Sequence, residues 1–371
     1  MKFSVRSADL QKALSKTVSV VPSRSTLPIL ENLLFEVHSN KLKITATDLE
    51  ISVSVELDVQ SSQNGTIAIP AKRIFDTVKA LSDTQINFTI DVESNKIKMK
   101  TDNGEYTLTG ESSDEFPKIP EFKGEAEVLF EVAHLQKLVG TTLFAVSSDE
   151  LRPAMMGVLL QLTKNEVRAV ATDGHRLVRM TNSNINGGKI TKDIIIPAKA
   201  LSLFDKVATG NEIKISISST HVVFKFENTS LISRLIEEKY PNYETVIPLD
   251  NENSLIVNKH EMLQSVRRVS LYSNSTTHQI RLSISKDQLQ MTAEDIDFGS
   301  DAKEKISCDY NGEELEIGFN SAYVVDVLTH METDEVEFKL SSPNRAAILS
   351  PRVPKEGENL LMLIMPVRLN N

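Results

Sequence analysis

Alternating apolar and polar positions run along much of the chain and predict β-strands. Between residues 51 and 59, every second residue is Ile, Val or Leu, and the residues between them are Ser, Glu or Asp. Residues 213–217 place isoleucine at every second position in the same way. A strand with this pattern buries one face and exposes the other to water.

A second period, in which apolar residues recur at i, i+3 and i+4, predicts amphipathic helices. Leu10, Leu14 and Val18 follow this spacing, while Lys12 and Lys16 occupy the opposite face. Six windows are expected to be helical: 8–21, 71–81, 133–146, 197–208, 259–273 and 320–331.

The order of these elements recurs three times. Each copy opens with a short amphipathic helix, and its strands lead to an Ala-x-Asp turn at Asp48, Asp173 or Asp295. The aspartates lie 125 and 122 residues apart. Self-similarity at a fixed period indicates modules that associate through equivalent faces, and this period suits whole domains.

Two further landmarks set the expected boundaries between the copies. A strand that runs into the second helix follows each turn, and the segment Glu115–Pro120 is echoed by Lys239–Tyr243. A length of 371 residues at about 100–200 residues per domain agrees with three copies. We therefore expect domains at 1–124, 125–250 and 251–371.

Each domain is expected to be α+β. The predicted strands outnumber the helices and pair with their neighbours in sequence, which favours an antiparallel sheet layer with both helices of the domain packed on one side.

Composition narrows the setting in which the protein works. Cys308 is the single cysteine, which excludes an intrachain disulfide. The first six residues lead into an alternating strand without a hydrophobic signal segment, so a cytoplasmic location is expected. The longest strongly apolar run, 360–365, is far shorter than the roughly 20 residues that span a bilayer, and no membrane role is expected.

Charge is distributed unevenly over the predicted elements. The chain has a formal net charge of −10, but the six helical windows together carry +6, which leaves −16 on the remainder. Positive charge collected on one set of elements creates a local field that the net charge conceals. The basic helix residues are Lys12, Lys16, Lys72, Arg73, Lys79, Lys137, Lys199, Lys206, Arg267 and Arg268.

These residues have two interpretations. Lysine and arginine commonly decorate solvated helix faces and improve solubility. If the faces converge, they contact phosphates without reading bases, because backbone contacts carry no sequence information. The chain lacks tryptophan and any aromatic-rich basic stretch, which argues against a platform that stacks single-stranded bases. Duplex DNA, bound without sequence preference, is the expected ligand.

An enzyme is the competing hypothesis. Asp173 and His175, beside Arg176, suggest a metal-dependent hydrolase, but the other two copies have Glu50 and Asp297 in place of His175. No phosphate-binding glycine loop and no nucleophile elbow occurs in the sequence. We expect the aspartate of each copy to order a turn, and we expect no catalytic residue, metal or cofactor. An acidic protein-binding scaffold that never encircles DNA is a further alternative.

Four segments, in order, resemble the bacterial sliding clamp, the beta subunit of DNA polymerase III. They are LPILENLL at 27–34, VATDGHRL at 170–177, EIGFN at 316–320 and MPVRL at 365–369. The resemblance implies a head-to-tail homodimer of three-domain protomers that closes into a ring of six domains, with sheets outside and helices lining the hole. It also implies a non-catalytic processivity factor that encircles duplex DNA and raises the effective concentration of a tethered polymerase.

The resemblance assigns roles to particular residues. Arg24 matches a DNA-contacting position, and Tyr106 and Leu108 are expected to meet Leu271 and Tyr272 across the dimer contact. Family members bind short, partly hydrophobic peptides of polymerases, the clamp loader and repair proteins in a groove between the second and third domains. The matching lining residues are Arg152, Thr172, Gly174, His175, Arg176, Leu177, Pro241, Val246, Met365, Pro366, Arg368 and Leu369.

The chain departs from the family pattern at the groove and at its end. Met155 replaces a familiar leucine, Thr245 an arginine and Ala346 a serine, so the peptide preference is expected to differ. Asn370 and Asn371 extend past the usual end of the chain at Leu369.

Overall fold

The computed structural model describes residues 1–119, 122, 124–188 and 190–369. Asn370 and Asn371 lie outside the described residues. The described chain forms two compact units, which are presented separately below: Met1–Ala133 with Lys199–Leu235, and His134–Ala198 with the chain from Ile236 onward. Every pair of neighbouring strands is antiparallel, as expected from the short connections.

The first unit contains a five-stranded sheet and an eight-stranded sheet. The five strands, in spatial order, are β5 (Gln60–Gln63), β1 (Lys2–Arg6), β7 (Gln85–Asp91), β8 (Lys96–Lys100) and β9 (Glu105–Thr109). The eight are β10 (Ala126–Glu131), β15 (Glu212–Ile217), β16 (His221–Phe226), β17 (Thr229–Arg234), β4 (Ile51–Asp58), β3 (Lys41–Thr47), β2 (Asn32–His38) and β6 (Gly65–Pro70).

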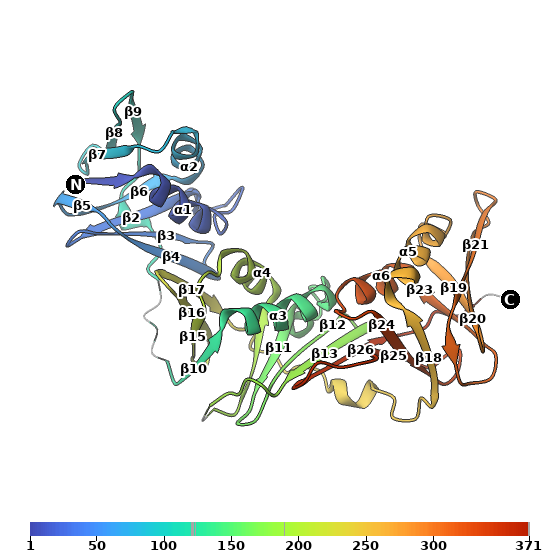
Figure 1. Cartoon of the computed structure of the whole chain (residues 1–371). Helices are drawn as coiled ribbons and strands as arrows, with labels where there is room; N and C mark the ends of the chain where they lie inside the picture. The colour runs from blue at the N-terminus through green and yellow to red at the C-terminus, as the bar shows by residue number, and fades with distance from the viewer. Residues whose placement is uncertain (120–121, 123, 189, 370–371) are drawn as a thin grey trace. The chain divides into compact units, whose positions relative to one another are not determined.

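Helices cover the apolar faces of the first unit. Helices α1 (Ser7–Val18) and α2 (Ala71–Ala80) lie side by side (Figure 1). Helix α4 (Ala198–Val207) buries Phe204 against Phe224 and Phe226 of β16, with ring centroids 5.4 and 6.1 Å apart. Burying such aromatic rings removes a large apolar area from water.

The second unit contains a nine-stranded sheet and a four-stranded sheet. The nine are β14 (Lys192–Pro197), β11 (Gly157–Leu162), β12 (Val167–Thr172), β13 (Arg176–Asn182), β26 (Glu358–Ile364), β25 (Ala347–Pro351), β24 (Glu335–Leu340), β18 (Asn253–Asn258) and β22 (Asp309–Tyr310). The four are β21 (Ser300–Ser307), β20 (Gln288–Asp295), β19 (Gln279–Ser285) and β23 (Leu315–Asn320).

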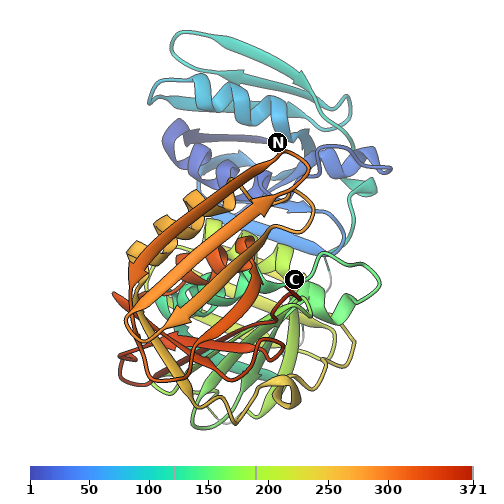
Figure 2. The same ribbon diagram turned by 90° about the vertical axis from the view of Figure 1, so that its right-hand side faces the viewer.

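Two helices of the second unit pack together and belong to the third repeat. Helix α5 (Lys259–Ser270) lies across the four-stranded sheet, whose strands face the viewer in Figure 2, and it contacts α6 (Ser321–Thr329). Helix α3 (Val132–Thr142) begins at the end of the first unit's chain segment. None of the helices in the described ranges is long and apolar enough to cross a membrane.

The strand order repeats three times, which confirms the triplication predicted from the sequence. The orders β6-β2-β3-β4, β14-β11-β12-β13 and β23-β19-β20-β21 are equivalent, and so are β1-β7-β8-β9, β10-β15-β16-β17 and β18-β24-β25-β26. The repeats are joined through their sheets, because β17 pairs with β4 and β26 pairs with β13. Each large sheet is therefore shared by two consecutive repeats.

A backbone bridge closes each repeat at an equivalent place. The strand carrying Ala68, Ile195 or Gly318 bonds to the segment that follows the last strand of the same repeat. In the third repeat, the amide of Val367 donates to the carbonyl of Gly318 at 2.9 Å. The segment after Met365 is thereby fixed along β23.

The predicted helix windows extend beyond the observed helices. The first ends at Val18 rather than residue 21, and the fifth ends at Ser270 rather than residue 273. Val20 is buried in the turn after α1, so its apolar character imitates a further helical position. The third window tightens into a 3₁₀ helix, η3 (Leu143–Ala145). The excess ends hold no charged residue, and the helix charge of +6 is unchanged.

Replacing Gly318 by valine is expected to release the C-terminal segment. A Cβ atom at residue 318 would lie 2.7 Å from Leu369 Cδ2 and 2.8 Å from the carbonyl oxygen of Val367. We expect a loss of about 1–3 kcal/mol in the free energy of unfolding and faster hydrogen exchange at the Val367 amide. Gly140→Val is the steric control, because Gly140 is exposed on α3 and a Cβ there meets no atom within 4 Å. An unchanged exchange rate at Val367 would contradict the expectation.

Candidate functional site

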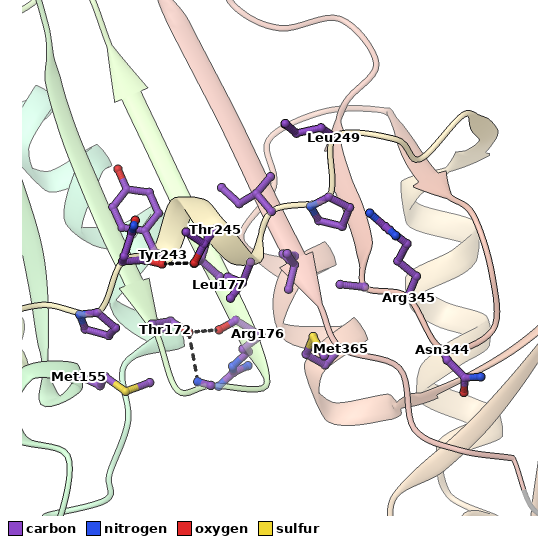
Figure 3. A pocket seen from close by; sticks show the side chains of 18 of the residues that line it. Met155, Thr172, Arg176, Leu177, Tyr243, Thr245, Leu249, Asn344, Arg345 and Met365 are labelled. Carbon is purple, nitrogen blue, oxygen red and sulfur yellow. Dashed lines mark hydrogen bonds between the residues drawn. The ribbon is translucent and has the colours of Figure 1, made fainter.

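A groove of about 730 Å³ opens on the nine-stranded sheet of the second unit (Figure 3). This volume falls within the range of known ligand sites, about 300–1,000 Å³. Its walls come from the β12–β13 turn, the segment 241–250, the segment 344–346 and the end of β26. The lining residues are Met155, Thr172, Gly174, Arg176, Leu177, Pro241, Asn242, Tyr243, Thr245, Val246, Ile247, Pro248, Leu249, Asp250, Asn344, Arg345, Ala346, Leu363 and Met365.

The β12–β13 turn forms a rigid wall. Asp173 Oδ1 accepts hydrogen bonds from the amides of His175 (2.8 Å) and Arg176 (2.9 Å), and Thr172 Oγ1 donates to the Arg176 carbonyl at 2.7 Å. Gly174 has a φ of +90°, which favours glycine. A Cβ there would also lie 2.9 Å from Arg152 Nη1. The turn is thus fixed by its own side chains, and Arg152 packs closely against Gly174.

The floor of the groove is apolar and well packed. Leu159, Val170, Leu177 and Leu363 belong to one buried cluster on the sheet. Tyr243, from the 3₁₀ helix η5 (Tyr243–Val246), covers this cluster; its hydroxyl donates to Gln161 Oε1 at 2.8 Å and accepts from Arg168 at 3.0 Å. The polar end of Tyr243 is therefore satisfied while its ring stays on the apolar floor.

The rim combines exposed apolar and polar groups. Leu249 is 97% exposed, and Val246 and Met365 are also exposed. Arg345 forms an ion pair with Asp250 at the same end of the groove. An apolar floor with a few fixed polar groups at the rim suits a short amphipathic ligand.

Eight of the sequence-predicted groove residues line the groove. They are Met155, Thr172, Gly174, Arg176, Leu177, Pro241, Val246 and Met365. The departures Thr245 and Ala346 line it as well.

The remaining five predicted residues do not line the groove. His175 instead stacks on Tyr323 with ring centroids 6.1 Å apart, and the Arg152 side chain pairs with Asp149 at 2.8 Å. Pro366, Arg368 and Leu369 follow Met365 into the segment fixed along β23, where Leu369 packs on Gly318. The backbone bridge to β23, which sequence proximity to Met365 does not reveal, turns these residues away.

Sequence reasoning also missed part of the lining. Ile247, Pro248 and Leu249 form an apolar run in a loop, and this run was a signal for an exposed apolar surface. Tyr243 lies in the boundary segment Lys239–Tyr243, whose sequence does not indicate a ligand site. Asn344 and Arg345 reach the groove through the pairing of distant strands, for which the local sequence gives no signal.

The conserved turn position of the repeats orders the backbone, as predicted. Asp48 Oδ1 accepts from the amide of Ile51 at 2.7 Å, and Asp295 Oδ1 accepts from the amide of Asp297 at 3.1 Å, as Asp173 does in its own turn. Within the described part of the chain, no three His, Cys, Asp or Glu side chains are grouped so as to hold a metal ion. Asp173 is engaged with Arg176 at 3.1 Å.

Most of the basic helix residues are exposed, but they differ in their partners. Lys12, Lys72, Arg73, Lys79, Lys199, Lys206, Arg267 and Arg268 are exposed, as is Arg24 in the loop after α1. Lys199 pairs with Asp48, and Arg268 pairs with Glu304 at 2.6 Å, which holds the Glu304 pKa below its usual value. The neighbouring carboxylates partly neutralise the charges of Lys199 and Arg268.

Two of the basic residues are half-buried. Lys16 donates to Thr209 and Thr229 at 2.9 and 3.1 Å, and burial lowers its pKa. Lys137 bonds both carboxylate oxygens of Glu358, at 2.6 and 2.7 Å. Lys137 is therefore an internal ion-pair residue in this structure, contrary to the expectation of a free cation on a helix face. A carboxylate from a strand far along the chain neutralises it.

The residues predicted at the dimer contact are available at the surface. Tyr106 and Leu108 are half-buried on β9. Leu271 is 80% exposed and Tyr272 is also exposed, directly after α5.

Three repeats of two helices and antiparallel sheets, joined strand to strand and carrying an apolar groove, define the class of DNA clamps. Comparison with known proteins identifies the family. Models of the N-terminal, central and C-terminal domains of the DNA polymerase III beta subunit match residues 1–120, 130–242 and 244–368. The chain is 31% identical to a beta sliding clamp of Haemophilus influenzae over 373 residues, with both chains fully covered, and 28% identical to one of Staphylococcus epidermidis over 99% of each.

Solved structures agree with this result. The DNA polymerase III subunit beta of Pseudomonas aeruginosa matches with a TM-score of 0.94 at 28% identity, and a Bartonella birtlesii sliding clamp bound to griselimycin matches with 0.94 at 29%; both matches cover all of each chain. The chain belongs to the DNA polymerase III beta subunit family. It is a DNA sliding clamp, a non-catalytic accessory subunit of the replicative polymerase, and the expected α+β class with three clamp domains is confirmed.

Proposed function

We propose that the clamp closes head to tail with a second copy around duplex DNA, and that domains 1–124, 125–250 and 251–371 are its three modules. The observation that carries this proposal is a pair of unpaired strand edges. Consecutive repeats within the chain are joined by such edges: β17 of the second repeat pairs with β4 of the first, and β26 of the third pairs with β13 of the second. By the same repeat order, β9 lacks a partner beyond β8, and β21 lacks one beyond β20, within the described residues.

Burial along these two strands supports the pairing. Every second residue of β17 is buried, whereas β9 and β21 alternate only between half-buried and exposed residues. An exposed strand edge is a template for pairing with another chain. Heterologous contacts of this kind form a ring when the rotation closes.

A repeated pair of residues supports the same contact. Leu143 and Phe144 directly follow α3, and Leu271 and Tyr272 directly follow α5. Phe144 stacks on His330 of the next repeat at 4.1 Å, inside the second unit. In the described part of the chain, Tyr272 is exposed and stacks on no other ring. We infer that Leu271 and Tyr272 meet the first domain of the second copy, near Tyr106 and Leu108.

Two further apolar residues are exposed beside β21. Ile296 and Phe298, in the β20–β21 turn, are 82% and 81% exposed. Their equivalents in the second repeat, by distance from the aspartate of the turn, are Gly174 and Arg176. Large exposed apolar patches mark interaction sites. Ile296 and Phe298 extend the proposed dimer contact.

The exposed basic residues are proposed to contact the DNA backbone. Helix positions such as Lys12, Lys72 and Lys206, together with Arg24, supply positive charge in a chain of net charge −10. A ring that encloses DNA needs only weak phosphate contacts, which permit sliding. Lys137 is left out of this set because Glu358 and Glu332 neutralise it.

The groove is proposed to capture short, partly hydrophobic peptides of the polymerase catalytic subunit, the clamp loader and repair proteins in the cytoplasm. Its support is the apolar floor around Leu177 and the exposed Met365 and Val246 at the rim. A related clamp binds griselimycin, which provides a defined probe. Thr245 and Ala346 line the groove where the family pattern has an arginine and a serine. We therefore expect this groove to prefer different peptides from those that other family members bind.

A charge in the groove is expected to abolish its binding. Met365→Asp places a carboxylate at the apolar rim, and we expect the Kd for griselimycin to rise at least 100-fold, which is about 2.7 kcal/mol. Isothermal titration calorimetry measures the change. Val353→Asp is the matched control, since Val353 is exposed in the same unit and does not line the groove. Equal weakening by both variants would contradict a site at this groove.

A further inference from the structure

One arginine of the groove wall is attached to the third repeat. The Arg176 side chain is 10% exposed and donates from all three of its nitrogens. Nε bonds Asp173 at 3.1 Å, Nη2 bonds the carbonyl oxygen of Phe144 at 2.8 Å, and Nη1 bonds the carboxylate of Asp326. Asp173 belongs to the same turn, Phe144 to η3 and Asp326 to α6.

Aromatic rings hold the guanidinium on two sides. Its central carbon lies 5.2 Å from the Phe144 ring centroid and 4.8 Å from that of Tyr323. Phe144 stacks in turn on His330, whose Nδ1 lies 2.8 Å from the carbonyl oxygen of Asp326. Cation–π contacts strengthen when the cation is removed from water, as it is here.

The backbone of Arg176 is hydrogen-bonded to other residues of the groove wall. Its carbonyl oxygen accepts from Thr172 Oγ1, and the same hydroxyl oxygen accepts from the Gly174 amide at 3.1 Å. Thr172, Gly174 and Arg176 all line the groove; Thr172 and Arg176 are labelled in Figure 3. Asp326 and Phe144 do not. The side chain of one groove residue therefore joins the wall to two segments outside it.

We propose that Asp326 is a positioning residue for partner binding, which holds Arg176 against Phe144 and Tyr323 and so fixes the Thr172–Gly174 wall. The proposal rests on the proposed peptide-binding role of the groove. It predicts that the affinity of the groove depends on a carboxylate of α6 that never touches the ligand. Helix α6 is one of the helices expected to line the hole of the ring. The bond between Arg176 and Asp326 therefore connects the groove wall to a helix of the hole.

The chemistry explains why arginine and aspartate are suited to these positions. A guanidinium is planar and offers a fork of donors, so it meets Asp173, Asp326 and a carbonyl at once while its faces rest on two rings. A neutral amide at residue 326 keeps an acceptor oxygen but loses the charge. The guanidinium is then held by weaker bonds at one end and turns toward Asp173.

The test is a double-mutant cycle measured by titration with griselimycin. Asp326→Asn is expected to raise the Kd about 10-fold and Phe144→Leu about 3-fold, whereas Asp326→Glu restores most of the affinity. In an Arg176→Ala background, Asp326→Asn is expected to change the Kd less than 2-fold, because coupled residues are not additive. Glu314→Gln, which removes an exposed carboxylate of the third repeat, is the control and should leave the Kd unchanged.

A second readout separates positioning from general stability. Hydrogen exchange at the Gly174 amide is expected to accelerate in Asp326→Asn, while exchange at buried strand amides such as Val336 stays the same. An equal Kd for Asp326→Asn and the wild type would overturn the proposal. So would an additive cycle, in which Asp326→Asn weakens binding equally with and without Arg176. A wild-type protein that does not bind griselimycin would instead contradict the proposed function of the groove.

Discussion

Substituting aspartate for both Leu271 and Tyr272 is expected to convert the protein into a folded monomer. The wild type should scatter as a particle of about 83 kDa, twice the 41.3 kDa of one chain, and the variant as one of 41.3 kDa. Both side chains are exposed in the single chain, so the substitution removes no core packing. In the dimer it buries two carboxylates without partners at each of the two contacts, which costs several kcal/mol per ion.

Small-angle scattering on the peak from a sizing column measures this change, with the mass taken from forward scattering. The wild-type distance distribution should be that of a hollow, flat ring. Leu249→Asp is the control, because Leu249 is as exposed as Leu271 but lies at the groove. A variant that keeps the mass of about 83 kDa would refute the assignment of this contact. Circular dichroism confirms that the monomer is folded.

Reversing three helix lysines is expected to weaken the DNA contact and spare the groove. Lys12, Lys72 and Lys206 are exposed, and they lie on α1, α2 and α4. Changing them to glutamate shifts the chain's charge by −6. Because a ring of two copies loses six lysines, the plot of log K for duplex DNA against log salt concentration is expected to lose about 5 from its slope. The affinity at low salt should fall more than 10-fold.

Fluorescence anisotropy with a labelled duplex provides the binding measurement, and griselimycin titration provides the readout of the groove. The same reversal at Lys225, Lys239 and Lys286, which are exposed and lie outside the helices, is the matched control. If both triple variants lose DNA binding equally, net charge rather than the helix surface is responsible. Unchanged DNA binding and polymerase stimulation by the helix variant would favour a protein-binding scaffold that does not enclose DNA.

Local patterns predicted the elements well because burial leaves a direct mark on the sequence. The alternation of residues 51–59 corresponds to β4, and Asp173 orders its turn as its position in the repeat indicated. Helix ends were predicted less well, since a buried residue in the following turn, such as Val20, has the same apolar character as one more helical position.

Some of the groove residues can be predicted from short sequence motifs, whereas others reach the groove only through contacts between distant segments. Its turn, Thr172–Leu177, was found by motif, because the residues that shape it are adjacent in sequence. Pro366, Arg368 and Leu369 are not among the lining residues, because their direction depends on the pairing of Val367 with Gly318. Arg345 and Asn344 were missed because they reach the groove only through the strand pairs β25–β26 and β26–β13.

The three repeats, their strands and helices, the positive charge on the helices and the family of the chain can all be predicted from the amino-acid sequence. These features follow from periodicity, composition and short motifs. Three features become visible only in the folded chain: the strand edges that pair between repeats, the ion pair of Lys137 with Glu358, and the bond of Arg176 to Asp326. Each of these contacts joins residues 150 or more positions apart. Such contacts depend on the packing of whole sheets, on which local propensity has no bearing.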